Sequence, residues 1–220
     1  MPAASLEAGR RRRTITVIDL THPISADLPV YFPWHPGTEI AQTATYAEHL
    51  CVVRRVSIGS HSGTHIDAPS HIFEGMPTID EYDPKLWYSE AAVLDFTGRE
   101  PRQAITGAEL KAKGVEKGIG VVIKTGWDKH FGEEDYYRTY PPISNEAAEF
   151  LADRQVPVLA ADTPFTLDVH RILLKRGIPL ITNINNTDRL PEGRIRLIAA
   201  PLLIRGGDGA PARVLAVLEP

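Results

Sequence analysis

The stretch His61-Ser-Gly-Thr-His65-Ile-Asp67-Ala-Pro-Ser-His71 places three histidines and one aspartate within eleven consecutive residues. Neutral imidazole and carboxylate are ligands that suit Zn²⁺, Mn²⁺ and Fe²⁺. Three protein ligands with an open coordination position are typical of a catalytic metal site rather than a structural one. The stretch therefore indicates an enzyme.

The spacing of these residues predicts the shape of the backbone. In a helix, Asp67 would lie about 120° around the axis from His61, and no glutamate follows His61 to make a zinc-protease motif. In a straight strand, His61 and His65 would stand roughly 13 Å apart, too far for one ion. We therefore expect an extended chain that bends at Gly63, which accepts positive φ, and again at Pro69.

These bends allow His61, His65 and Asp67 to reach one divalent ion, Zn²⁺ or Mn²⁺, which we assign as the cofactor. The alternative is a set of ordinary surface residues. Packing does not readily explain such a cluster in a loop punctuated by glycine and proline, so we favour the metal site.

Composition predicts one globular domain. The chain has 220 residues, 43% of them hydrophobic and 24% charged, which is enough for one core. Its net charge of −4 argues against a nucleic-acid or anionic-membrane partner. We expect residues 1–13, with the basic run Arg10–Arg13, to form a flexible tail ahead of a domain at 14–220. The alternation after this run is typical of a strand, not of a signal peptide, and no stretch approaches membrane-spanning length.

Cysteine usage points to a reducing compartment. Cys51 is the only cysteine, so no intrachain disulfide framework exists, and we predict a cytoplasmic protein. Because it lies in the apolar run Leu50–Val53, we expect Cys51 to be a buried core residue rather than a nucleophile.

Short apolar runs bounded by turn residues predict the strands of a central sheet system. They are 15–20, 52–58, 92–96, 120–124, 156–161, 178–181, 195–199 and 213–218. Helices are predicted after the capping box of Thr106 and Glu109, after Ser144, and over 169–176 before Gly177. Because the early strands follow one another without helical crossovers, we predict a single-domain α/β fold with mixed β-sheets.

Other residues could complete a site. Tyr31, Phe32 and Trp34 could form an aromatic wall for a planar substrate, or a plug under the first loop. Asp162 ends an apolar strand, where it could support the site or simply start an Asx turn. His170 could act as a base or a ligand, or be an ordinary surface histidine.

The chain resembles the cyclase family of metal-dependent hydrolases. The resemblance rests on the His-x-Gly-Thr-His-x-Asp-x-Pro-x-His pattern and on shorter matches along most of the chain. Those matches are Asp19–His22, Leu28–Tyr31, Lys124–Gly126, Ala161–Pro164, His170–Leu174 and Ala200–Leu202. It implies a swivelling β/β/α fold and a homo-oligomer, either a dimer or a tetramer.

The resemblance also implies roles for the site residues. It makes His61, His65 and Asp67 metal ligands and His71 the proton shuttle, and it assigns His170 to a second metal site. That second site would need a glutamate twelve residues after His170, where this chain has Thr182.

A neutral hydroxyl cannot offset a second divalent charge. We therefore expect one ion per subunit, with His170 hydrogen-bonded to water or substrate. Thr182 and Asn183 are expected to support the ligands.

The predicted function is hydrolysis of an amide or lactone bond in a small aromatic or cyclic molecule, with His71 as general acid and base. Candidate substrates are aryl N-formyl amides such as N-formylkynurenine, cyclic amides such as isatin, and lactones. The alternative is a metal-dependent small-molecule binding protein that lost turnover with the missing glutamate.

Overall fold

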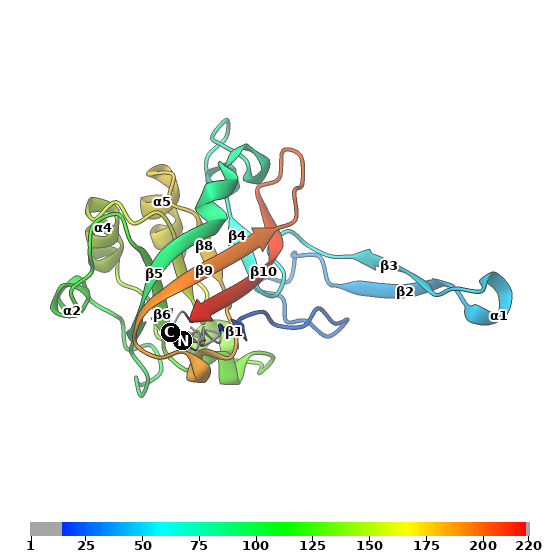
Figure 1. The fold of residues 1–220 in the computed structure, drawn as a ribbon, viewed down its shortest axis with the longest axis horizontal. Helices are drawn as coiled ribbons and strands as arrows, with labels where there is room; N and C mark the ends of the chain where they lie inside the picture. The colour runs from blue at the N-terminus through cyan, green and yellow to red at the C-terminus, as the bar shows by residue number, and fades with distance from the viewer. Residues whose placement is uncertain (1–14, 219–220) are drawn as a thin grey trace, which may run out of the picture.

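The computed structural model describes residues 15–218, so the predicted tail at 1–13 lies outside the described residues. The centre of the molecule is a mixed eight-stranded sheet (Figure 1). Its strand order is β1-β10-β4-β8-β7-β6-β5-β9. Its strands are β1 Thr16–Asp19, β4 His65–Asp67, β5 Tyr88–Asp95, β6 Gly120–Lys124, β7 Leu159–Ala161, β8 Leu180–Thr182, β9 Gly193–Pro201 and β10 Gly209–Leu218.

The sheet closes into a barrel-like arrangement because β10 pairs with β9 as well as with β4 and β1. Strands β5, β6, β7 and β8 pair in parallel with one another, and the other pairings, including β5 with β9 and β8 with β4, are antiparallel. Closure leaves few unpaired backbone groups at sheet edges. The prediction of a single-domain α/β fold with a mixed sheet is confirmed.

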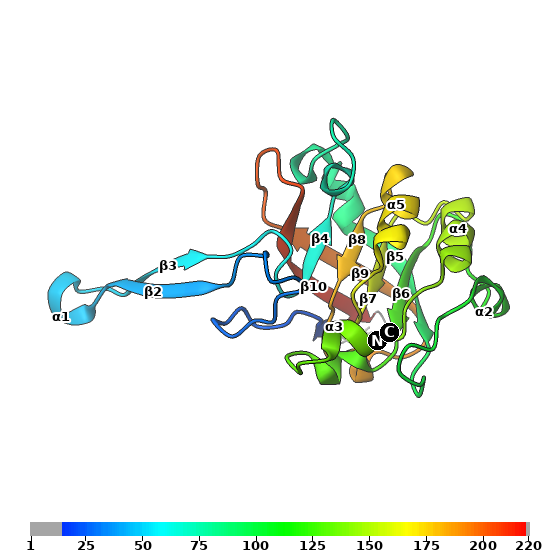
Figure 2. The same cartoon turned by 180° about the vertical axis from the view of Figure 1, so that it is seen from behind.

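Three helices cover one face of the sheet (Figure 2). They are α2 Gly107–Ala112, α4 Asn145–Asp153 and α5 Leu167–Lys175. Each begins at a capping hydroxyl, from Thr106, Ser144 and Thr166, that accepts a backbone N–H three residues on. The predicted capping box at Thr106 is confirmed, with both reciprocal bonds present.

The remaining short elements lie in the connections. They are α1 Tyr46–His49, α3 Tyr136–Thr139, and the 3₁₀ turns η1 Pro69–His71, η2 Ile79–Glu81, η3 Pro84–Trp87, η4 Trp127–His130 and η5 Thr187–Arg189. Among residues 15–218, no helix is both long and apolar enough to cross a membrane.

Strand alternation divides the core into two layers. In β6, Val121 and Ile123 pack toward the helices with Leu151 of α4. Val122 points to the other face, where it packs with Ile181 of β8 inside the curled sheet. Burying each such side chain contributes about 1.5–3 kcal/mol. Both faces of the central strands are therefore apolar, which fixes their register.

One predicted strand lies outside the central sheet. β3 Val53–Ser57 pairs with β2 Glu39–Ala44 in a separate antiparallel ribbon that projects from the body (Figure 1). Cys51 is exposed near the far end of this ribbon, so its predicted burial is wrong. A local apolar run shows the tendency to form a strand, but it does not show whether another part of the chain covers that strand.

Candidate active site

The His61–His71 stretch bends where the spacing predicted. Gly63 has φ 61°, a left-handed conformation that costs glycine little. His65 and Asp67 then enter β4 and are buried between β8 and β10. Pro69 opens the turn η1, which carries His71 back over the same site. One short segment thus delivers four side chains to one place.

Each histidine around Asp67 has one ring nitrogen held by a second partner. His65 Nδ1 donates to the Gly63 carbonyl at 2.8 Å, and His170 Nδ1 donates to the Thr166 carbonyl at 2.8 Å. His61 Nε2 donates to Asp208 at 2.8 Å. Such bonds fix the tautomer and aim the other nitrogen inward.

The inward nitrogens converge on the carboxylate of Asp67. His61 Nδ1 lies 2.6 Å and His65 Nε2 3.3 Å from Asp67 Oδ1, while His170 Nε2 lies 3.3 Å from Oδ2. When two ligand atoms bind the same tetrahedral ion, each at about 2 Å from it, the two atoms lie roughly 3.3 Å from each other. The donor atoms of His61, His65 and Asp67 lie within 4.8 Å of one another, and the set fits a divalent cation.

The contacts between Asp67 and its histidines favour the charged form of the Asp67 carboxylate and of the His61 imidazole. Burial alone would raise the pKa of Asp67, but the charge of His65 and hydrogen bonds from His170 and His61 hold it well below its usual value. Burial would lower the pKa of His61, but its bonds to Asp208 and Asp67 raise it to about 9. The contacts of Asp67 therefore favour its charged form, as the ligand role of a carboxylate requires.

Thr182 contacts Asp67 directly, because β8 pairs with β4 in a register that places it opposite His65. Its Oγ1 donates to Asp67 Oδ2 at 3.1 Å. The hydroxyl therefore lies beside the carboxylate oxygen that faces His170. Two further groups, Asp67 with His71 and His170, and His61 with His71 and Asp208, also have donor atoms within 4.8 Å.

Asp208 is a site residue that the sequence interpretation missed. It accepts from His61 and lies 3.5 Å from His71 Nδ1. It stands in the Gly206–Gly209 turn just before β10, 147 positions from His61. A lone acid in a glycine-rich turn was the available signal, but only the β4–β10 pairing brings it to the site.

The neighbouring Gly209 allows this close approach. A Cβ there would lie 2.6 Å from the Ile66 carbonyl oxygen and 2.7 Å from His61 Cε1, both shorter than real contacts. Only glycine fits without moving the His61 ring.

A cavity of about 390 Å³ opens onto the histidine cluster. Tyr31, Phe32, Trp34 and His35 form one wall, so the aromatic loop lines the cavity rather than plugging the core. Other lining residues are Ile72, Tyr137, Pro164, Phe165, Leu167 and Asn183. The size and the apolar walls suit a small planar molecule.

Asp162 does not contact the histidines. It is fully buried and accepts from the backbone N–H of Thr125 and Gly126 and from Thr187 Oγ1. Burial raises its pKa to about 6. Tyr136 connects Asp162 to the His61–His71 stretch, because the Tyr136 hydroxyl donates to the backbone carbonyl of Asp162.

Asn183 completes this connection. The Tyr136 hydroxyl also lies 3.0 Å from Asn183 Oδ1, and Asn183 Nδ2 donates to the Gly63 carbonyl at 3.2 Å. Asn183 has φ 57°, a conformation that asparagine tolerates better than most residues. Together with His65 Nδ1, which donates to the same carbonyl, it therefore supports the Gly63 bend.

The fold and the site together define a class of protein, a single-domain α/β protein with a barrel-like mixed sheet whose His/Asp cluster suits a divalent metal ion. The profile of one family, described as putative cyclase, matches residues 18–168. The chain belongs to this cyclase family.

Relatives and solved structures agree with this assignment. Kynurenine formamidase of Bacillus cereus is 25% identical over 94% of this chain and 99% of its own length. Isatin hydrolase A from Ralstonia solanacearum superposes with a TM-score of 0.83 at 27% identity, covering 93% of this chain and 92% of its own. A potential metal-dependent hydrolase with cyclase activity gives 0.78 at 28% identity, covering 94% and 100%. An isatin hydrolase bound to thioisatinate, a product analogue, shares the fold at 24% identity, with a TM-score of 0.85 and coverage of 94% and 93%.

Proposed function

We propose that this chain hydrolyses the C–N bond of a small planar amide, either an aryl N-formyl amide or a cyclic amide of the isatin type, with aryl lactones as further substrates. The observation that carries the proposal is the aromatic cavity of about 390 Å³ that ends at the histidine cluster. The kynurenine formamidases and isatin hydrolases among its relatives support this substrate class.

His61, His65 and Asp67 would hold one divalent ion, Zn²⁺ or Mn²⁺. When bound, such an ion supplies Lewis acidity, which polarises a carbonyl group and makes water more acidic. The hydroxyl of Thr182 binds Asp67 Oδ2 as a neutral donor and brings no second negative charge. This absence of a carboxylate at Thr182 is the reason why the proposal includes one ion per subunit.

His71 would move the proton. Its ring lies over that of His61 at 3.9 Å between centroids and 5.8 Å from that of His170, at the boundary between cluster and cavity. A histidine there can take a proton from water and return it to the leaving nitrogen. His170 Nε2 faces Asp67 and the cavity, where it would orient water or substrate.

The aromatic wall would orient the substrate. Trp34 and Phe32 stack at 5.1 Å, and Tyr31 meets Phe32 edge to face at 4.4 Å. Flat apolar walls would exclude water from one face of the substrate ring and orient the substrate carbonyl toward the histidines.

A homo-oligomeric state and a cytoplasmic location stay predictions.

The test is a hydrolysis panel of an N-formyl arylamine, isatin and an aryl lactone, with enzyme loaded with Zn²⁺ or Mn²⁺ and a chelator-treated control. Chelator-sensitive turnover of an amide supports the proposal. His130→Ala is a control for the loss of a histidine outside the cluster and should keep full turnover, because His130 is the last residue of η4 and pairs with Glu133. If no member of the panel turns over, the binding-protein alternative is favoured.

A further inference from the structure

His35 belongs to the wall of the cavity that opens onto the histidine cluster. Its backbone N–H donates to the Phe32 carbonyl at 2.9 Å, which closes a turn in the aromatic loop. Its ring packs edge to face on Trp34 at 4.4 Å and on Phe32 at 5.4 Å between ring centroids. The turn and these two ring contacts hold the imidazole at a defined place in the wall.

The ring nitrogens of His35 differ from those of the other cavity histidines. His61, His65 and His170 each have a ring nitrogen that is hydrogen-bonded to a carboxylate or a backbone carbonyl. Within residues 15–218, neither ring nitrogen of His35 has such a partner. Burial lowers the pKa of His35, so its imidazole is neutral at pH 7. A neutral imidazole has one N–H donor and one acceptor nitrogen, and both are available to a molecule in the cavity.

Outside the histidine cluster, the cavity wall is uncharged. The lining residues, all within the described part of the chain, include no lysine, arginine or glutamate, and Asp67 is the only aspartate among them. Asp67 is already bound by His61, His65 and His170. Burial raises the pKa of Tyr137 to about 13, so its hydroxyl stays neutral. No side chain of the wall outside the cluster is therefore available to pair with a charge on a substrate.

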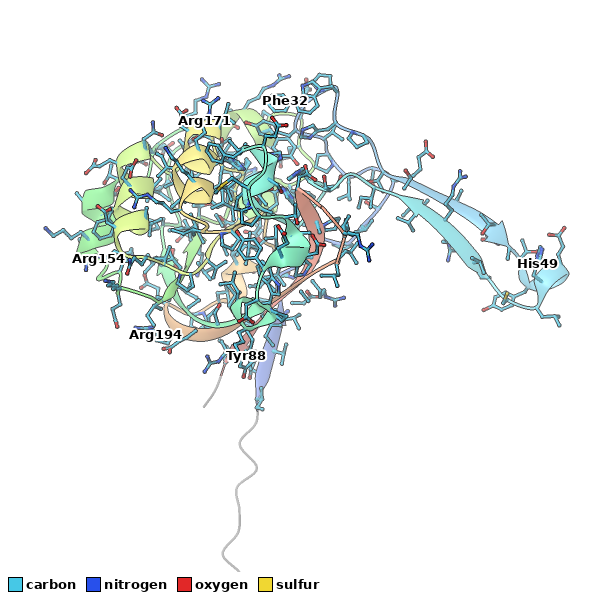
Figure 3. All side chains as sticks on the ribbon, turned by 90° about the horizontal axis from the view of Figure 1, so that it is seen from above. Phe32, His49, Tyr88, Arg154, Arg171 and Arg194 are labelled. Carbon is cyan, nitrogen blue, oxygen red and sulfur yellow. The ribbon has the colours of Figure 1, made fainter. Side chains whose placement is uncertain are left out.

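The lining residues that are most exposed to solvent mark the mouth of the cavity. Phe32, Trp34 and Leu167 are 42, 75 and 52% exposed, and all three are apolar. Phe32 lies at the edge of the body, on the same side as Arg171 of α5 (Figure 3). Arg171 does not line the cavity, and its Nη1 lies 3.4 Å from Asp168 Oδ1, which balances its charge. The mouth is therefore apolar like the wall.

These features limit the part of a substrate that lies away from the bond that is cleaved. A charged group that loses water without gaining a partner of opposite charge is strongly disfavoured. The amino-acid end of N-formylkynurenine carries an ammonium and a carboxylate group, and the described wall has a partner for neither. A carbonyl oxygen needs only one N–H donor, which His35 has.

We propose that this site takes an uncharged aryl amide with a second carbonyl group, and that His35 binds the oxygen of that second carbonyl. This assignment rests on the proposed function, because it requires the amide carbonyl to face the histidine cluster. Isatin has its ketone next to the amide carbonyl, and an N-formylaniline with an ortho acyl group has the same two groups on one ring. His35 is then a residue that determines specificity and takes no part in bond cleavage.

The first test compares three N-formylanilines that differ only in the ortho acyl group. The acyl group is acetyl, isovaleryl, or the amino-acid chain of N-formylkynurenine, and kcat/KM is measured with metal-loaded enzyme. Both uncharged compounds should exceed N-formylkynurenine by about tenfold or more, because only its chain carries unpaired charges. The isovaleryl compound controls for chain length. If N-formylkynurenine is used as well as the isovaleryl compound, or if both are equally poor, the proposal is overturned.

The second test is His35→Phe, which keeps an aromatic ring beside Trp34 and removes both ring nitrogens. The KM for the acetyl compound should rise about tenfold with little change in kcat, as expected for one lost hydrogen bond. The KM for N-formylaniline, which has no second carbonyl, should stay the same. His35→Gln keeps an N–H donor and should recover part of the loss. His130→Phe is the control variant, because His130 does not line the cavity. Equal changes for the two substrates in His35→Phe would show a merely structural role and overturn the assignment.

Product binding separates this inference from the proposed function. Calorimetric titration with 2-aminoacetophenone and with kynurenine, the two amines that the acetyl compound and N-formylkynurenine would release, needs no turnover. About tenfold tighter binding of 2-aminoacetophenone, with the difference reduced in His35→Phe, supports the inference. If that result is obtained while no amide is hydrolysed, only the proposed function fails. Equal affinities for the two amines in the wild type overturn the inference, whatever the turnover of amides.

Discussion

Asp208 is expected to control metal affinity through His61, and Asp208→Asn tests this. The carboxylate accepts from His61 Nε2 at 2.8 Å and so holds Nδ1 toward Asp67. Asparagine has nearly the same shape, and its oxygen can still accept this bond. The variant therefore removes charge rather than contact.

The magnitude follows from the environment of the pair. A hydrogen bond to a charged group contributes about 1.5–3 kcal/mol. The Asp208 side chain is 46% exposed, so solvent screens it, and part of the bond survives in the amide. About 1–1.5 kcal/mol remains, which corresponds to roughly a tenfold loss of metal affinity. Substitutions of such supporting partners typically cost about 10–100-fold.

The assay is titration of metal-free protein with Zn²⁺ or Mn²⁺ against a competing chelating indicator. Asp80→Asn is the control, because Asp80 accepts from Gly206 in the same turn and does not contact the histidines. Affinity equal to that of the wild type in Asp208→Asn would refute the reasoning. A loss well beyond 100-fold would refute it differently, by making Asp208 a ligand itself.

Three further predictions concern single side chains. Asp67→Asn should abolish tight metal binding, because the neutral amide loses the charge term; full occupancy by elemental analysis would contradict its role. His71→Ala should keep the metal but lose about 10²–10⁴ in kcat, whereas unchanged turnover would remove His71 from the mechanism. Burial lowers the pKa of His22 to about 4, so the unfolded chain binds the extra proton between about pH 6.5 and 4, and wild-type stability falls as pH falls through that window. His22→Phe keeps an aromatic ring stacked on Phe131 but cannot bind this proton. When the pH is lowered from 7 to 5, its free energy of unfolding, measured with denaturant, should fall by about 2 kcal/mol less than that of the wild type. Equal decreases in the two proteins would reject this account.

Much of the fold could be predicted because its signals are local. Capping residues such as Thr106 and Ser144 satisfy nearby backbone N–H groups, and both helices begin where expected. Central strands such as β6 are buried on both faces and read as continuous apolar runs. β2 and β4 were not predicted, since β2 is polar and β4 is hidden within the metal-binding stretch.

The candidate site divides in the same way. The bend at Gly63 and the turn at Pro69 follow from backbone preferences of single residues, so the spacing was enough to predict them. Asp208 could not be found, because its contact with His61 depends on the pairing of β4 with β10. The wall formed by Phe165 and Leu167 likewise arises from segments far from the aromatic loop.

The sequence by itself determined which ligand types the candidate site contains. Three histidines and an aspartate with two backbone bends predict a metal site wherever that segment lies, because ligand type and local conformation are properties of a few neighbouring residues. Only the tertiary structure decided what surrounds them, namely the hydroxyl of Thr182 on Asp67 and the carboxylate of Asp208 on His61. It also decided that β3 lies in an exposed ribbon, where a strand of the central sheet was expected. Those features depend on strand pairing and closure over long sequence separations, and no local pattern encodes which surfaces meet.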